Sequence, residues 1–300
     1  SPVLEGFSAS EKGFSQQECV RVRALMQDVA IPPLPTIVAQ VIRFDANDPK
    51  NGAAELEKLI LPDRAISADL LRVSNSAFYG RSGKVKSLKD ALAVLGVKAT
   101  KNLVVYLSTR AMASAYKSDT FRKYLNRYPI FAALTAQAVA SGTTMKAQAE
   151  EGFLAALLHS IGMNLLALQR EGHYSDMLAA CEKNKWNLAQ LEKQSYGVTH
   201  TELGKKAAVH WSLPEIYQKL MEITPSTDAG TLTEPMEKLT FIAAVTAATL
   251  LEIPYPETSK AAAQQLYAGI GGSGDLLARH GSAEALQRLQ NHPFAQLAGV

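Results

Sequence analysis

Residues 61–80 decide the fold class, and their sequence is Leu61-Pro-Asp-Arg-Ala-Ile-Ser-Ala-Asp-Leu-Leu-Arg-Val-Ser-Asn-Ser-Ala-Phe-Tyr-Gly80. Pro62 ends one helix because proline cannot continue the hydrogen-bond ladder, and Asp63 can cap the next helix. That second helix carries apolar residues at helical spacing over residues 66–73. Gly80 permits the positive φ that commonly closes a helix end. The stretch therefore predicts two helices separated by a tight turn.

The same helical periodicity continues on both sides of this stretch, and no convincing alternation typical of strands interrupts it. Gly96 offers a bend between two helices, and the longest loop is expected at 224–233, where Pro, Ser, Thr, Asp and Gly cluster. The sequence predicts an all-α fold in two helical lobes. Three expected helices are marked by single residues: one capped by Asp63 that carries residues 66–73, one that opens at Ser87 and runs through Val94, and one after Gly96 that carries residues 103–107. The others cover residues 34–45, 53–61, 131–140, 150–169, 174–183, 188–194, 199–208, 213–223, 234–252, 257–270 and 282–289.

Composition indicates a compact globular protein, because 47% of the 300 residues are apolar and only 20% are charged. The two cysteines, Cys19 and Cys181, lie far apart, which favours a reducing compartment over a disulfide scaffold. The longest uncharged apolar run, residues 239–251, is shorter than the roughly 18 to 20 residues that a membrane span needs. With no secretion signal in the first residues, we expect a cytoplasmic protein with no membrane partner.

Positive charge is concentrated in the first half of the chain. The net charge is +3, but residues 1–150 carry 20 Lys and Arg against 13 Asp and Glu, and the second half is net acidic. The densest basic stretch, residues 81–101, lacks the stacking aromatic residues typical of nucleic-acid modules. We therefore interpret it as a solvated face and do not expect a nucleic-acid partner. A nucleotide or nucleic-acid binder is the alternative. The possible basic patch consists of Arg81, Lys84, Lys86, Lys89, Lys98 and Lys101.

Several motifs, in order along the chain, resemble those of the HDOD family. The segment 61–80 is the most specific, and the others are Ile31-Pro-Pro-Leu-Pro-Thr36, Ser87-Leu-Lys-Asp-Ala-Leu-Ala-Val-Leu-Gly96, Phe153-Leu-Ala-Ala-Leu-Leu-His-Ser-Ile-Gly162, His200-Thr-Glu-Leu-Gly204 and Trp211-Ser-Leu-Pro214. The resemblance implies a helical fold related to HD-domain metal phosphohydrolases, found in bacterial signalling proteins and often lacking catalysis. It assigns residues 24–225 to an HDOD domain, 1–23 to a lead-in helix or tag remnant, and 226–300 to a C-terminal helical extension that packs on the domain.

The metal ligands that the resemblance implies are largely missing. HD enzymes use a His on one helix, a His-Asp pair on the next and a distant Asp, whereas here the pair is His159-Ser160 and the first position aligns near Tyr128. The helix expected to supply the distant Asp, residues 240–251, contains no carboxylate, and His200 remains as a second imidazole. We therefore predict no catalytic residue, no metal and no cofactor. Tyr128, His159, Ser160 and His200 are predicted to form a vestigial pocket, whose histidines are either structural or line a small-molecule site.

The predicted function is that of a non-catalytic bacterial regulatory output module in signal transduction. Its partner would be a regulatory or signalling protein, such as a sensory or receiver domain in a longer chain. The alternative is a metal-dependent phosphohydrolase of nucleotides or cyclic dinucleotides, with ligands drawn from Glu150, Glu151 or Glu202. The candidate interaction segment combines adaptable polar groups with aromatic surface, although the same residues also suit a helix end anchored on the core. It consists of Arg72, Asn75, Ser76, Phe78, Tyr79 and Gly80.

Overall fold

The computed structural model describes residues 31–80, 83–113 and 117–297 of the chain. Every regular element in these ranges is a helix, and none of them contains a strand. The predicted all-α class is therefore confirmed. The predicted lead-in segment 1–23 and Arg81 lie outside the described residues.

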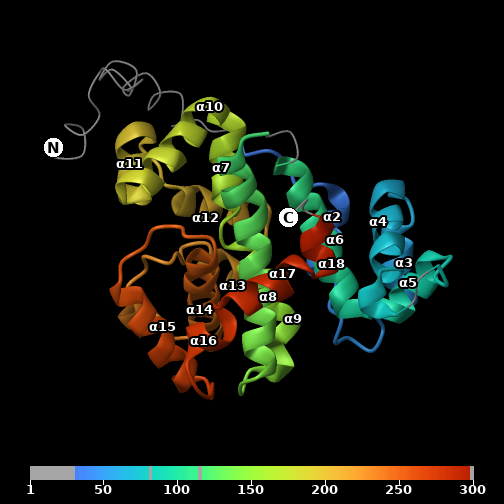
Figure 1. Cartoon of the computed structure of the whole chain (residues 1–300). Helices are drawn as coiled ribbons and strands as arrows, with labels where there is room; N and C mark the ends of the chain where they lie inside the picture. Colours follow the sequence, from blue (N-terminus) through green and yellow to red (C-terminus); the bar gives the residue numbers. More distant parts are fainter. Residues whose placement is uncertain (1–30, 81–82, 114–116, 298–300) are drawn as a thin grey trace.

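The first lobe is built from the N-terminal helices, drawn in blue and teal in Figure 1. Two of them begin at the predicted caps: Asp63 accepts a hydrogen bond from the backbone N–H of Ile66 at 3.0 Å, and Ser87 accepts one from Asp90 at 3.1 Å. Gly96 takes a positive φ of 81°, and the next helix leaves at 111° to the previous one. The elements are α2 (Thr36–Arg43), α3 (Ala53–Ile60), α4 (Arg64–Ser74), η1 (Ala77–Tyr79), α5 (Leu88–Leu95) and the long α6 (Val97–Ala113).

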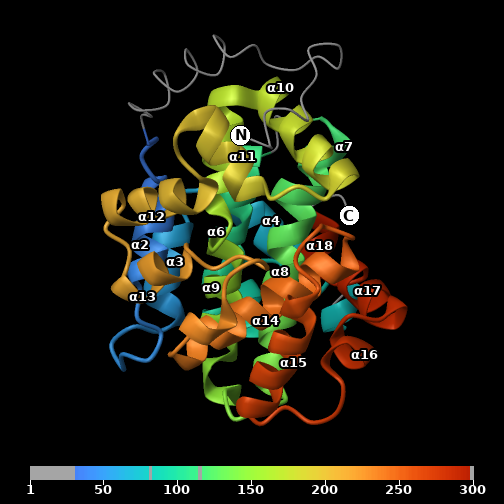
Figure 2. The same ribbon diagram turned by 90° about the vertical axis from the view of Figure 1, so that its left-hand side faces the viewer.

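The second lobe holds the remaining helices, which Figures 1 and 2 show gathered around α8 and α14. One of its elements, η2, is a π-helical segment that runs directly into α8. The elements are α7 (Asp119–Phe121), η2 (Arg122–Arg127), α8 (Tyr128–Ser141), η3 (Lys146–Gln148), α9 (Ala149–Leu158), α10 (Ile161–Asn184), α11 (Leu188–Tyr196), α12 (His200–His210), α13 (Glu215–Leu220), η4 (Ala229–Thr231), α14 (Pro235–Leu250), α15 (Thr258–Gly269), α16 (Leu276–His280), α17 (Ala283–Gln290) and α18 (Pro293–Leu297).

The core of the second lobe lies where α8, α9 and α14 pack against one another. These helices are apolar on nearly every face, as expected for helices surrounded by others, and Phe131, Phe153 and Phe241 are fully buried in them. Helix α6 contacts α2 and α5 of the first lobe and α9 of the second, so it joins the two lobes. Because α14 is part of this core, residues after 225 help to hold the second lobe together.

The C-terminal helix also touches both lobes. Phe294 at the start of α18 packs edge-on against Phe153 of α9, with ring centroids 5.9 Å apart. The neighbouring His292 lies 4.9 Å from the ring of Phe78, which belongs to η1 of the first lobe. The last helices therefore bridge the two lobes through aromatic contacts.

One predicted helix extent is wrong. Residues 150–169 do not form one helix, because α9 ends at Leu158 and α10 begins at Ile161, with a turn at residues 159 and 160. The predicted helix 174–183 is instead the second half of α10, which is kinked at Arg170, where φ is −147° and ψ is 51°. The short α16 and α18 were not expected, because five residues give little periodicity to detect.

One described helical stretch, residues 146–184, is long and apolar enough to be compared with a membrane span. Within it, 89% of the apolar window is buried inside the fold. A buried, uniformly apolar helix is the pattern of a core helix packed on all sides by other helices.

Candidate functional site

A cavity of about 710 Å³ opens in the second lobe. Its wall is formed by η2 and α8, the turn between α9 and α10, the start of α12, and the segments that follow α13 and α14. All four predicted pocket residues, Tyr128, His159, Ser160 and His200, line this cavity. The turn at residues 159 and 160 brings two of them to its surface, and the π-helical η2 leads into the helix that carries Tyr128. π-Helical segments are frequent at functional sites.

The imidazole of His159 is held on both nitrogens. Nδ1 lies 2.5 Å from the carbonyl oxygen of Ala156 and therefore donates to it, which leaves Nε2 to accept a hydrogen bond from the Tyr128 hydroxyl at 3.0 Å. Burial lowers the pKa of His159 to about 4, because the charged form would lose its hydration. Burial also raises the pKa of Tyr128, which keeps its hydroxyl protonated as the donor. Near neutral pH this histidine is uncharged, and its one lone pair is already used.

Ser160 occupies the position next to His159, and its side chain is equally buried. The residue is 3% exposed, and Oγ has no hydrogen-bond partner within the described part of the chain. Ser160 lies in the turn between α9 and α10, and its hydroxyl does not bond to the carbonyl of Ala156, which accepts from His159. The hydroxyl is therefore left with unused hydrogen-bonding capacity at the cavity wall.

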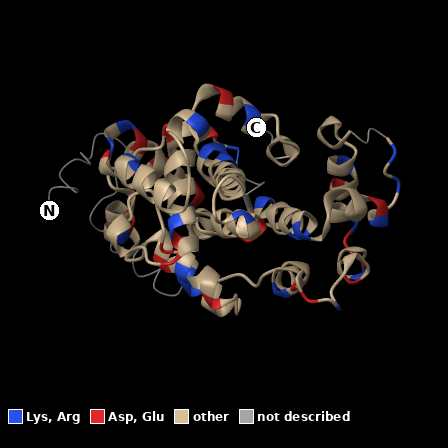
Figure 3. Cartoon of the chain, turned by 90° about the horizontal axis from the view of Figure 1, so that it is seen from below, with Lys and Arg blue, Asp and Glu red and all other residues tan. Residues whose placement is uncertain are grey.

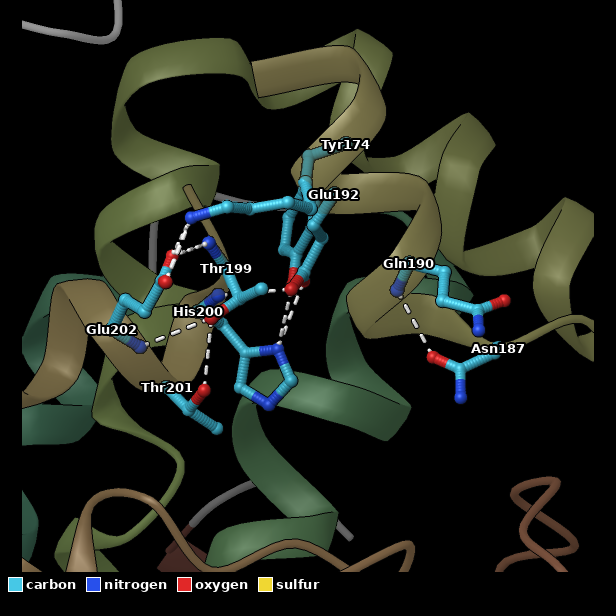
Figure 4. A network of polar contacts seen from close by, with 9 residues as sticks. Tyr174, Asn187, Gln190, Glu192, Thr199, His200, Thr201 and Glu202 are labelled. Atoms are coloured by element: carbon cyan, nitrogen blue, oxygen red, sulfur yellow. Dashed lines mark hydrogen bonds and ion pairs between the residues drawn. The ribbon is translucent and has the colours of Figure 1, made fainter. Parts of the chain in front are cut away.

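His200 is oriented by a buried carboxylate that sequence reasoning missed. Figure 4 shows Glu192 of α11 beside the ring, with Nδ1 of His200 donating to its carboxylate at 2.7 Å. The backbone N–H of His200 donates to the same carboxylate at 2.9 Å, and the Tyr174 hydroxyl does so at 2.7 Å. Glu192 has no exposed surface, so these three donors replace its lost hydration. A carboxylate that fixes one imidazole nitrogen leaves the other, Nε2, available on the cavity side.

A detectable signal for Glu192 existed in the sequence. Residues 191, 192, 195 and 196 share one face of α11, and all four are buried. A carboxylate on an apolar helix face indicates a buried partner. The phosphohydrolase alternative would draw its ligands from other acids, but Glu150 binds Asn102 and Gln137, whereas Glu202 caps α12 and pairs with Lys193. Neither of these carboxylates, nor Glu151, lines the cavity.

Gly162 allows the wall of the cavity to close. A Cβ added to Gly162 would lie 1.8 Å from the carbonyl oxygen of His200 and 2.9 Å from the backbone nitrogen of Gly204. Because these neighbours are backbone atoms, they cannot rotate away as a side chain would. The missing side chain therefore lets α10 approach the first turn of α12 and places His200 beside the turn at residues 159 and 160.

The candidate interaction segment lies in the first lobe and does not line the cavity. Asn75 binds the backbone of Val85 twice, donating from Nδ2 to its oxygen at 2.8 Å and accepting from its nitrogen at 3.0 Å. Tyr79 packs on the core, whereas Phe78 keeps 61% of its surface exposed. The segment thus has structural polar groups and one aromatic ring that contacts His292 and Tyr79 on one side and is otherwise exposed. Of the others, Arg72 pairs with Asp69, the Oγ of Ser76 is buried, and Gly80 has a φ of 61°.

The family model of the HDOD domain matches residues 31–225, which is well over half of the chain. The chain belongs to the HDOD family. A protein of Treponema pallidum, named only as uncharacterized, is 26% identical over 189 residues. The match covers 62% of this chain and 36% of the relative, so this chain aligns with about a third of that protein.

Three solved structures share the fold of this HDOD protein. An HDOD domain protein of Geobacter sulfurreducens matches with a TM-score of 0.71 and 20% identity, covering 92% of this chain and 98% of its own. A Marinobacter aquaeolei protein whose name suggests signal transduction has a TM-score of 0.68 and 19% identity, covering 94% and 65%. A Shewanella amazonensis protein whose name suggests a phosphohydrolase has a TM-score of 0.63 and 21% identity, covering 92% and 97%. At these identities the likeness shows the fold alone.

The HDOD site does not fit the metal centre of HD enzymes. Such a centre needs several carboxylate and imidazole ligands converging on the ion. Within residues 31–80, 83–113 and 117–297, no group of three or more His, Cys, Asp or Glu side chains is placed to hold a metal ion. His159 would have to release Tyr128 before its Nε2 could coordinate, and Ser160 offers a neutral hydroxyl in the place of a carboxylate.

The possible basic patch is divided in the folded HDOD protein. Lys98 lies 3.6 Å from Glu151, and Lys101 is half-buried and donates to the backbone oxygen of Phe44 at 2.8 Å. Burial lowers the pKa of Lys101. Figure 3 shows Lys and Arg interspersed with Asp and Glu over most helices. Arg81 is outside the described residues, and the exposed members of the patch are Lys84, Lys86 and Lys89.

Proposed function

We propose that this HDOD protein is a non-catalytic regulatory module of bacterial signal transduction, which acts in the cytoplasm by binding a partner protein. The observation that carries the proposal is the state of the HD-like site. The Tyr128 hydroxyl donates a hydrogen bond to Nε2 of His159, so this nitrogen has no free lone pair. Ser160 stands in the next position, where an HD enzyme has a carboxylate. The named relatives suggest both signal transduction and phosphohydrolysis, and this donor set favours the first.

Hydrolysis of a phosphoester by an HD-type centre requires a cation that neutralises phosphate charge and lowers the pKa of the attacking water. Of the two imidazoles, Nε2 of His159 is already bonded to Tyr128, whereas His200 donates to Glu192 through Nδ1 and keeps Nε2 as one possible ligand atom. The acids nearest the cavity mouth are partly committed too, because Glu182 pairs with Lys123 at 2.6 Å. The site therefore lacks the converging negative groups that would hold a divalent cation.

A surface for the partner is offered by the first lobe. Phe78 is 61% exposed, and Asn75 holds the loop that presents it through two hydrogen bonds to the backbone of Val85. An exposed aromatic side chain on a fixed loop loses little conformational entropy on binding, which suits an interface anchor. The partner would be a regulatory or signalling protein, such as a sensory or receiver domain.

A hydrolysis assay tests the absence of catalysis. The purified chain is incubated with Mg²⁺, Mn²⁺, Fe²⁺ or Zn²⁺ and with nucleoside triphosphates or cyclic dinucleotides, beside His159→Ala as a matched control. We expect equal, background rates for both proteins. Metal-dependent turnover that His159→Ala abolishes would refute the proposal and support the phosphohydrolase alternative.

Binding is tested with the native partner. Cross-linking in the source bacterium, followed by quantitative mass spectrometry, compares the wild-type protein with Phe78→Ala. Leu168→Ala is the control, because Leu168 is an apolar residue on α10 that is also exposed, at 45%. We expect the Phe78→Ala variant alone to lose its strongest partner. Equal partner recovery with both variants would contradict a role for this surface.

A further inference from the structure

Two residues that line the cavity at the HD-like site each have a polar side-chain atom with no hydrogen bond to a described residue. One is Oγ of Ser160, which is buried and bonded to no described residue. The other is Nε2 of His200, because the hydrogen bonds of that ring to the described residues all involve Nδ1. A buried hydroxyl without a partner is less stable than one that is bonded, because it has lost its hydration. A molecule in the cavity that bonds to these groups would replace that hydration.

Glu192 gives His200 a fixed orientation. It receives Nδ1–H and the backbone N–H of His200, together with the Tyr174 hydroxyl, so both the ring and its helix start are constrained. Since Nδ1 donates to the carboxylate, Nε2 is presented to the cavity in a defined direction. A preorganised group of this kind favours binding, because little conformational freedom is lost when a ligand arrives.

Aromatic side chains form much of the remaining wall. Tyr124 and Tyr128 lie on the η2 and α8 side, and Trp186 and Tyr255 come from the segments after α10 and α14. Flat aromatic surfaces favour a planar ligand, which can stack on them or meet their edges. A volume of about 710 Å³ is within the range of cavities that hold small organic molecules.

The charges on the wall do not suit a phosphate group. Among the residues that the structure describes, the basic side chains that line the cavity are Lys185 and Lys260, and none is an arginine. Lys260 already pairs with Glu257 at 3.0 Å, and Glu182 and Glu252 add negative charge nearby. Phosphate recognition normally uses several cationic or backbone N–H donors aimed at one point. This wall instead favours a ligand without negative charge.

We propose that the cavity binds an uncharged heteroaromatic molecule whose polar edge hydrogen-bonds to Oγ of Ser160 and Nε2 of His200. The ring lies between the aromatic walls, and its edge supplies an acceptor for the serine hydroxyl. This site would add small-molecule control to the module, and its existence does not depend on the identity of the protein partner.

Isothermal titration of the full chain tests the proposal. The probes are adenine, nicotinamide and adenosine as uncharged heteroaromatic molecules, and AMP as the relative of adenosine that differs by one phosphate. We expect at least one uncharged probe to bind with one-to-one stoichiometry, and AMP to bind at least about tenfold more weakly than adenosine. Binding of none of the three uncharged probes, or binding of AMP as tight as that of adenosine, would overturn the proposal.

Two serine variants locate the bound probe. Ser160→Ala removes the unpartnered hydroxyl in the cavity, and Ser67→Ala removes another buried, unpartnered hydroxyl on α4, away from the cavity. Loss of one hydrogen bond weakens binding by about twofold to tenfold. We expect this loss for Ser160→Ala and an unchanged dissociation constant for Ser67→Ala. Equal affinities in the two variants would contradict the assigned contact.

A cavity-filling variant provides a second, independent test. Ala189 lines the cavity from the first turn of α11 and is only half-buried, so Ala189→Trp can be made without overfilling the core. We expect the folded variant, checked by circular dichroism, to lose binding of every uncharged probe. Retained binding would place the ligand elsewhere and refute the assignment of this cavity.

Discussion

Replacing Gly162 by alanine tests how the cavity wall is assembled. Gly162 lies in the first turn of α10, where it meets the start of α12. A Cβ at this position would lie 1.8 Å from the carbonyl oxygen of His200, whereas ordinary contacts begin near 3.4 Å. The two helices must therefore separate by about 1.6 Å, or the backbone must distort, to admit one methyl group.

The cost can be worked from these contacts. Overpacking of a well-packed core typically costs about 1–3 kcal/mol. A displacement of His200 by this amount also lengthens the hydrogen bonds of its Nδ1 and backbone N–H to Glu192 from 2.7 and 2.9 Å to beyond hydrogen-bond distance. Hydrogen bonds to a charged group contribute about 1.5–3 kcal/mol each to stability. Because relaxation of the two helices can restore one of these two bonds, the overpacking and the loss of the other bond together give about 3–6 kcal/mol, and we expect Gly162→Ala to lower the free energy of unfolding by this amount.

Gly204→Ala is the matched control, since Gly204 faces Gly162 across the same contact. A Cβ at Gly204 would meet its nearest neighbours at 3.5 to 3.7 Å, which is ordinary van der Waals contact. Urea unfolding and thermal melting measure both variants. At roughly 2–4 °C per kcal/mol, Gly162→Ala should lower Tm by at least about 6 °C, and Gly204→Ala should change it little. A Gly162→Ala protein as stable as Gly204→Ala would refute the close approach of the two helices.

Three further predictions follow from buried and exposed groups. Glu192→Ala leaves the Tyr174 hydroxyl and the His200 imidazole without their acceptor, so it should lower the free energy of unfolding in urea by about 3–5 kcal/mol. Glu192→Gln should lower it less, and equal losses in the two variants would argue against the buried network. His159 has a folded pKa of about 4, below the unfolded value of 6.5, so the unfolded state binds more protons between these values. The stability that His159 contributes should therefore be complete above pH 6.5 and fall by up to about 3 kcal/mol toward pH 4. Burial also lowers the pKa of His280 and His292 to about 4, so they add to the same slope, and His159→Gln should flatten the profile in part; an unchanged slope would disprove the shift. Asn75→Ala should lower the free energy of unfolding by about 1–3 kcal/mol, because two hydrogen bonds to the backbone of Val85 are lost. Phe78→Ala should change it by no more than about 1 kcal/mol, because the ring is largely exposed, and thermal melts that reversed this order would contradict the assigned roles.

Much of the helical framework was predictable from local sequence. The caps at Asp63 and Ser87 and the bend at Gly96 depend on groups within four residues of one another, and the structure shows all three. The break at residues 159 and 160 was not predictable in the same way. The run from 152 to 168 is apolar on nearly every helical face, so its periodicity gives no sign of where the helix stops, and the structure places the break beside the close contact between Gly162 and α12.

The sequence by itself determined the all-α class, the order of the HDOD motifs and the loss of the carboxylate after His159, because these are properties of residue type and spacing. Only the tertiary structure decided that the Tyr128 hydroxyl bonds to Nε2 of His159 and that the Glu192 carboxylate orients the ring of His200. Those pairs are 31 and 8 residues apart in the chain and meet only after separate helices have packed. Burial removes the water that would otherwise hydrogen-bond to each polar group. The packed neighbours therefore determine which ring nitrogen of each histidine carries the proton and which polar groups remain without a partner.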